Sequence, residues 1–200
     1  MSNMWDQRYA GDDYFYGTEP NDFLRDRASV FPRGAEVLCL AEGEGRNGVF
    51  LARQGLRVTG VDGSIVGLEK AKRLAERYGV VIDTAVADLA DWDLGEKRWD
   101  GIVSIWAHLP APLRAGLHPR IAGAIKPGGV LFVEHYHPNQ IPYKTGGPPD
   151  PTWMLTLAEL DRDFGGWEKV HVFEGEREVH EGAGHGGLSY VTQAILRKPA

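Results

Sequence analysis

The sequence predicts an open α/β sheet, mostly parallel, with a C-terminal antiparallel hairpin and helices on both faces. From Val37 onward, short β-rich apolar runs alternate with longer amphipathic ones, which is the order of parallel strands joined by crossover helices. A glycine-rich turn follows the first apolar run, where such sheets pass from strand to helix. Near the C-terminus, two alternating runs flank the stretch Gly182–Gly187, a pattern typical of a hairpin.

The first half of the sheet is predicted from three segments. Glu36–Ala41 and Leu56–Val61 are expected to be strands, with a helix over Arg46–Gln54 between them. Ser64 is a good N-cap for a second helix, whose apolar positions keep helical spacing until Gly79.

The second half of the core continues the alternation. Strands are expected at Val80–Val86, Asp100–Trp106 and Gly129–His135, and a helix is expected at Pro112–Ile125. The turn KPGG introduces the last of these strands.

The last third of the chain has a different composition. Pro138–Pro151 contains five prolines and two adjacent glycines, which favours an exposed loop. A helix over Thr156–Phe164 and the hairpin strands Trp167–Val179 and Leu188–Leu196 are expected after it.

The N-terminal segment Met4–Val30 is too aromatic for a disordered tail, so we expect it to pack over the domain. Its aromatic residues are Trp5, Tyr9, Tyr14, Phe15, Tyr16 and Phe23.

Length and composition limit the function. Two hundred residues fit one domain, divided into an aromatic cap (1–30), a cofactor-binding core (36–135) and a substrate-side loop with the terminal hairpin (138–200). The net charge is −6 and no basic stripe is present, which argues against a nucleic-acid partner. Neither a membrane span nor a secretory start is present, and the single Cys39 lies in an apolar run, so we expect a cytoplasmic monomer or homodimer.

The turn AEGEGRNG is compatible with two ligands. Gly43, Gly45 and Gly48 also spell the dinucleotide fingerprint, and Asp62, 17 residues beyond Gly45, suits a ribose of either NAD or an adenosyl group. A separate substrate domain is absent and the terminal hairpin differs from the parallel last strand of an NAD domain, which favours the adenosyl ligand.

Seven segments occur in a characteristic order: WDQRY, YGTEPN, VLCLAEGEGRNGVFLA, VTGVDGS, VADLADWDL, WDGIVSIWAHLP and KPGGVLFVEHY. In this order and spacing they resemble the class I S-adenosylmethionine-dependent methyltransferases, and within them the branch related to the tellurite-resistance and thiopurine methyltransferases. The resemblance covers nearly the whole chain. It implies a Rossmann-like fold, an enzyme that transfers methyl groups to a small molecule, and S-adenosylmethionine as the cofactor.

The resemblance also implies where the cofactor binds. Asp62 would hold the ribose, and Asp88 would accept from the adenine amino group, with Leu89 packed on the ring. The full set implied is Gly43, Gly45, Asp62, Ser64, Asp88, Leu89 and Ser104.

The sequence departs from the family pattern at the first strand. Cys39 replaces the usual acidic residue and Ala41 the first glycine of the turn. Glu42 is the nearest carboxylate that could meet the cationic methionine part instead. Arg46 is a candidate partner of the methionine carboxylate, or else an arginine on the solvent side of its helix.

Several residues are candidates for the acceptor side. The end of the fourth strand carries Trp106, His108 and Pro110, and His108 is either a general base or a histidine with a structural hydrogen bond. Trp5 and Tyr16 could cover the sulfonium, since aromatic faces attract cations, or could simply pack. His180 and His185 resemble the C-terminal pattern of the branch and are expected to line the substrate pocket.

We predict no metal, because His180 and His185 are five apart in glycine-rich chain and miss the H-E-x-x-H spacing. Two other functions remain open: an NAD-linked oxidoreductase, and a non-catalytic cofactor-binding protein on the same fold. A thiol or another chalcogen species is the expected acceptor, because it needs little help to lose a proton.

Overall fold

The computed structural model describes residues 4–200. Seven strands form one sheet in the order β3-β2-β1-β4-β5-β7-β6, in which β1 to β5 are parallel and β7 is antiparallel to both neighbours. The strands are β1 (Glu36–Leu40), β2 (Arg57–Asp62), β3 (Asp83–Val86), β4 (Trp99–Ile105), β5 (Ile125–Tyr136), β6 (Glu168–Glu181) and β7 (His185–Arg197). The predicted mostly parallel sheet with an antiparallel C-terminal hairpin is therefore confirmed.

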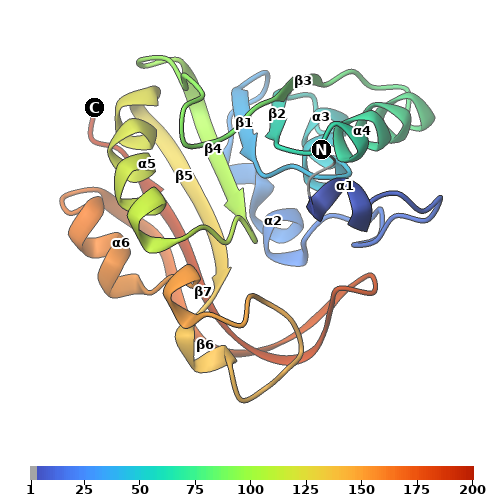
Figure 1. The fold of residues 1–200 in the computed structure, drawn as a ribbon. Coiled ribbons are helices and arrows are strands. Elements are labelled where there is room, and N and C mark those ends of the chain that lie inside the picture. The colour runs from blue at the N-terminus through green and yellow to red at the C-terminus, as the bar shows by residue number, and fades with distance from the viewer. Residues whose placement is uncertain (1–3) are drawn as a thin grey trace.

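Helices cover both faces of this sheet, as Figure 1 shows. They are α1 (Met4–Arg8), α2 (Asp22–Arg27), α3 (Arg46–Arg53), α4 (Ile65–Arg77), α5 (Ala111–Ala124) and α6 (Leu157–Asp163). Single 3₁₀ turns occur at Ala28–Val30, Pro138–Gln140 and Pro151–Trp153. None of the helices in residues 4–200 is long and apolar enough to cross a membrane.

The alternation of side chains along β1 divides the core into two layers. Val37 and Cys39 pack with α2, α3 and α4, whereas Leu38 and Leu40 pack with α5 and α6 on the opposite face. Each of these β1 side chains is at most 2% exposed, as expected of a parallel strand covered on both faces.

Local signals place most element ends close to their predicted positions. Ser64 caps α4, its Oγ accepting from Gly67 N at 3.0 Å, and Thr156 caps α6 in the same way. Two segments differ from their predicted ranges. β3 begins only at Asp83, and half of the glycine-rich stretch Gly182–Gly187 belongs to β7, since only residues 182–184 separate β6 from β7.

Candidate active site

A cavity of about 1030 Å³ lies at the carboxyl ends of the parallel strands. Its wall includes residues that follow β1, β2, β3 and β4, together with the N-terminal segment and the turn between β6 and β7. Open parallel sheets bind ligands at this edge, because the loops that follow the strands converge there.

The glycine turn after β1 forms one wall. Gly43 and Gly45 have φ values of 58° and 92°, a region that favours glycine. A side chain at Gly45 would stand 2.6 Å from Cα of Ala71 on α4, and one at Gly43 would stand 2.8 Å from Tyr9 Oη. Both positions therefore need glycine for packing as well as for conformation.

Asp62 ends β2 at the cavity wall. Its Oδ2 accepts from Gly43 N at 2.9 Å and its Oδ1 from Ser64 N at 2.7 Å, so the two amides fix the carboxylate. Asp88 and Leu89 line the same cavity after β3. Ser64 itself is fully buried and does not line the cavity, because its hydroxyl caps α4 and bonds to Asp6.

Glu42 occupies the space behind the turn. Its Oε1 accepts from Gly48 N at 2.7 Å, and a side chain at Gly60 would collide with its Cγ at 2.8 Å. Burial raises the pKa of Glu42 to about 7, and the Cys39 thiol hydrogen-bonds to it. The carboxyl group of Glu42 thus lies next to Cys39.

A buried ion pair ties the N-terminal segment to this wall. Lys70 Nζ lies 2.6 Å from Glu44 Oε1, and it also donates to the carbonyl groups of Gly11 and Asp13. The other oxygen of Glu44 accepts from Phe15 N at 2.7 Å. The aromatic segment before α2 is consequently held against the cavity, where Trp5 and Tyr16 line it.

The remaining wall is aromatic. Trp106 follows β4 with φ of 55°, a backbone conformation that L-residues seldom adopt. His185 has Tyr16 at 4.7 Å and Trp106 at 5.0 Å between ring centroids. Tyr136 stacks on Trp106 at 4.4 Å. This cluster lies on the β4–β6 side, across from the strand ends that carry Asp62 and Asp88.

Glu181 connects the aromatic wall to the glycine turn. Its Oε2 accepts from Arg46 Nη2 at 2.6 Å, from Trp106 Nε1 at 2.6 Å and from His185 Nδ1 at 3.1 Å. Its Oε1 accepts from Asn21 Nδ2 at 2.8 Å. Arg46 is buried in this contact, so the solvent-side alternative for Arg46 is wrong.

The sequence predicted His180, and not Glu181, to line the pocket. Successive side chains of β6 point to opposite faces, so that Glu181 is buried and the His180 side chain is 76% exposed beside Glu178. His180 is not part of the cavity wall, and the prediction that it lines the pocket is wrong. The alternation of inward and outward positions from Val179 to Glu181 is the signal that could have indicated a buried carboxylate at Glu181.

His108 and Ser104 have other partners. His108 Nε2 accepts from Tyr136 N at 3.2 Å, and burial lowers its pKa to about 3. Although His108 lines the cavity, its lone pair is occupied, which favours the structural alternative. Ser104 Oγ bonds to His135 Nε2 at 3.0 Å and does not line the cavity, so Ser104 lies away from the predicted cofactor path.

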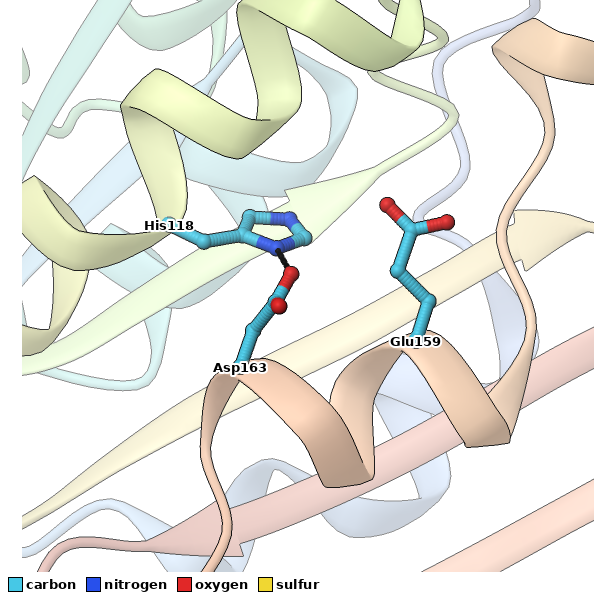
Figure 2. A group of neighbouring side chains, drawn as sticks. All are labelled: His118, Glu159 and Asp163. Atoms are coloured by element: carbon cyan, nitrogen blue, oxygen red, sulfur yellow. Dashed lines mark hydrogen bonds and ion pairs between the residues drawn. The ribbon is translucent and has the colours of Figure 1, made fainter.

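A second cluster, at the contact of α5 and α6, has the composition of a metal site. Figure 2 shows His118, Glu159 and Asp163, whose candidate ligand atoms lie within 4.8 Å of one another. His118 Nδ1 is 2.7 Å from Asp163 Oδ2, while Glu159 receives two hydrogen bonds from Arg114 and Asp163 two from Arg162. Each group already has a protein partner, and together these contacts join α6 to α5.

The donor groups of the main cavity suit a cationic cofactor. Among its lining residues are four carboxylates (Glu42, Glu44, Asp62 and Asp88) and two guanidinium groups (Arg8 and Arg46). Two of the carboxylates stand in the turn that opens α3, where the diphosphate of a dinucleotide would have to bind. Lys70 pairs with Glu44 and the pKa of Glu42 is about 7, so the negative charge of the turn is only partial, yet its carboxyl groups still suit a sulfonium better than a diphosphate.

Comparison with known proteins points to the same kind of cofactor. Residues 37–129 match the family model described as a methyltransferase domain. This part of the chain is a class I, S-adenosylmethionine-dependent methyltransferase domain. The resemblance inferred from the sequence, and S-adenosylmethionine as the cofactor of the domain, are thereby confirmed.

Known relatives of the methyltransferase domain include tRNA (uracil(54)-C(5))-methyltransferases. That of Pyrococcus furiosus is 31% identical over 156 residues, covering 73% of this chain and 34% of the relative, and that of Pyrococcus abyssi is 30% identical over 135 residues, covering 61% and 31%. The chain spans about a third of the length of these relatives. "Uncharacterized methyltransferase YbaJ" of Bacillus subtilis is 38% identical over 72 residues, covering 36% of this chain and 28% of the relative.

Solved structures share the fold of the methyltransferase domain over most of the chain. TehB from Haemophilus influenzae superposes with a TM-score of 0.73 at 21% identity, covering 88% of this chain and 62% of that one. The N-methyltransferase NodS from Bradyrhizobium japonicum, in complex with S-adenosyl-l-homocysteine, gives 0.71 at 15% identity, covering 98% and 97%.

Proposed function

We propose that the protein transfers the methyl group of S-adenosylmethionine to a small-molecule acceptor. The observation that carries the proposal is the composition of a single cavity. It combines carboxylates at the ends of β2 and β3 with an aromatic wall beside β4 and β7. Its volume, about 1030 Å³, is at the upper end of ordinary ligand pockets and leaves room for a cofactor and a small second ligand.

Named residues would hold the cofactor. Asp62 would accept from the ribose hydroxyls and Asp88 from the adenine amino group, with Leu89 against the ring. Gly43 and Gly45 would admit the methionine part. When bound, S-adenosylmethionine supplies a methyl group that is already activated on a sulfonium, so the protein chiefly aligns the acceptor and excludes water.

The remaining charged residues would complete the cofactor site. Glu42 lies behind the turn that would admit the methionine part and adds negative potential there. Arg46, although paired with Glu181, lines the cavity and stays a candidate for the methionine carboxylate. Trp5 and Tyr16 would cover the loaded site from the N-terminal segment.

A thiol or another chalcogen species is the acceptor that the aromatic wall supports best. Sulfur and its heavier relatives are soft nucleophiles that attack a methyl group readily once ionised. Aromatic side chains offer such polarizable atoms favourable contacts.

An RNA acceptor is the second candidate, because the Pyrococcus relatives are tRNA methyltransferases. The charge of this chain opposes it. The net charge is −6 and carboxylates outnumber guanidinium groups two to one among the cavity residues, whereas nucleic-acid sites need cations for the phosphates. We retain the cytoplasm as the proposed location, since the one cysteine, Cys39, is a buried free thiol.

An acceptor panel with a methyl-release readout tests the proposal. Thiols, selenite- and tellurite-derived species, phenols, amines, carboxylates and total tRNA form its arms, and His108→Ala is assayed beside the wild type. We expect a thiol or chalcogen arm to be fastest and His108→Ala to change it little. If total tRNA is methylated fastest, an RNA acceptor replaces the small molecule in the proposal. Cofactor binding without product in every arm would favour a non-catalytic role.

A further inference from the structure

The cavity contains a histidine whose two ring nitrogens have different surroundings. His185 is 6% exposed and lines the cavity, and its Nδ1 is 3.1 Å from Glu181 Oε2. Among residues 4–200, no hydrogen bond to its Nε2 is formed. The ring is also fixed by Tyr16 and Trp106, which contact it from two sides.

The partners of Glu181 determine which nitrogen carries the proton. Arg46 and Trp106 both donate to the same oxygen, and the cation of Arg46 helps to lower the pKa of Glu181 to about 2. An ionised carboxylate only accepts hydrogen bonds, so His185 Nδ1 must donate. In the neutral ring, Nε2 then keeps its lone pair.

The surroundings of His185 keep the ring neutral. Burial is the main cause that lowers its pKa, while Glu181 raises it and Arg46 and Arg8 lower it. The titratable groups that face the ring are Glu181, Arg46, Arg8, His108, Tyr16 and Tyr136. A neutral imidazole that is oriented by a carboxylate and open at Nε2 is the arrangement of a general base.

We propose that His185, oriented by Glu181, is the general base that takes the proton from a thiol acceptor. The proposal rests on the proposed function and narrows it to acceptors that arrive protonated. The S–H proton passes to His185 Nε2, the sulfur electron pair forms the new S–CH₃ bond, and the bond from the methyl group to the sulfonium breaks, leaving a neutral thioether. His185 then releases its proton to solvent. Glu181 is a positioning residue, since it acts through the imidazole.

Two thiols that each carry a phenyl ring but differ in acidity test this role, with S-adenosylmethionine as the methyl donor. Benzyl mercaptan is largely protonated near neutral pH and needs a base, whereas thiophenol ionises readily. We expect His185→Asn to lower kcat/KM for benzyl mercaptan by about 10²–10⁴ and for thiophenol by less than about tenfold. Glu181→Gln should also lower kcat/KM more for benzyl mercaptan than for thiophenol, but by a smaller factor than His185→Asn does. Equal losses for both thiols, or no loss for either, would overturn the proposal.

Two controls separate this proposal from the proposed function. His180→Asn alters the neighbouring exposed histidine of the same hairpin and should leave both rates unchanged. Calorimetry with S-adenosylhomocysteine should give wild-type affinity for His185→Asn and His180→Asn, and a wild-type protein that does not bind it would contradict the proposed function instead. If wild type methylates neither thiol, ¹⁵N NMR of the histidines decides. A neutral His185 protonated at Nδ1 supports the base, and protonation at Nε2 overturns it.

Discussion

At the level of single residues, the carboxylates of the cavity differ in how they are held. Asp62 receives two backbone amides and lines the wall, so both of its oxygens are oriented before any ligand binds. Glu42 also lines the cavity, but it accepts from only one backbone amide, that of Gly48, and its pKa is raised to about 7. Substitutions of these two residues should therefore have different effects.

Asp62→Ala is expected to weaken S-adenosylhomocysteine binding by at least about a hundredfold. Two charge-assisted hydrogen bonds to the ribose would be lost, each contributing roughly 1.5–3 kcal/mol. Isothermal titration calorimetry measures the change. Asp83→Ala, an exposed aspartate at the opposite end of β3, is the matched control and should bind normally. Wild-type affinity in Asp62→Ala would remove Asp62 from the cofactor site.

Glu42 makes the stability of the protein depend on pH. Its pKa is about 7 in the folded protein against 4.5 ordinarily, so the folded state binds the proton more tightly. This stabilisation is full below about pH 4.5 and is lost as the pH rises through 7. We expect the unfolding free energy of wild type, minus that of Glu42→Gln, to fall by up to about 3 kcal/mol between pH 4.5 and 8. Urea denaturation of the pair measures it, and parallel profiles would contradict it.

The sequence predicted strand-end residues better than residues defined by a side-chain direction. Asp62, Asp88 and Trp106 follow strands, and topology alone brings them to one edge of the sheet. Ser104 and His180 lie within or near strands, where one step along the chain reverses the face, and the sequence does not show which face is inward. Whether the Glu181 side chain points inward depends on the same choice of face.

At the level of elements, the strands were predictable because apolar runs and glycine turns mark them. The short helices α1 and α2 were not, since six residues or fewer give no helical period. Their positions depend on distant partners. Asn21, which caps α2 through Leu24 N, also bonds Glu134 on β5 and Glu181 on β6, contacts that only the folded chain creates.

The N-terminal segment is expected to respond to the cofactor. Trp5, Tyr9 and Tyr16 line the cavity, so a ligand beneath them adds contacts. Hydrogen exchange in residues 4–30 should slow when S-adenosylhomocysteine binds, as it would for a cover over the reacting centre. Equal exchange with and without ligand would mean that the segment only packs.

Lys70 on α4 anchors that segment. Lys70→Met leaves Glu44 buried and uncompensated, and loss of one partner of a buried pair costs roughly 3–5 kcal/mol. Chemical denaturation should show this loss, and residues 9–16 should exchange faster. The double variant Lys70→Met, Glu44→Gln removes the stranded charge and should recover part of the stability. A double variant no more stable than Lys70→Met would show that the carbonyl contacts of Lys70 dominate.

At the level of the whole molecule, ligand-induced stabilisation distinguishes the cofactor classes. S-adenosylhomocysteine at a hundred times its Kd adds about 2.7 kcal/mol to the folded state. For a domain of this size, that corresponds to a Tm increase of roughly 5–11 °C. NADH, whose diphosphate would meet Glu42 and Glu44, should leave the Tm unchanged in the same thermal scan. An increase with NADH alone would reverse the assignment.

Two segments far apart in the sequence, the N-terminal segment and the turn between β6 and β7, meet at the cavity. Ala183, in the turn between β6 and β7, donates its N–H to Phe15 O at 2.9 Å, and a side chain at Gly182 would collide with the backbone of Phe15 and Tyr16. On the ribosome, the contacts of Phe15 and Tyr16 with this turn must therefore wait until nearly the whole chain has been made. A nascent chain that ends at Gly166 should leave Phe15 and Tyr16 more open to protease than the full chain does.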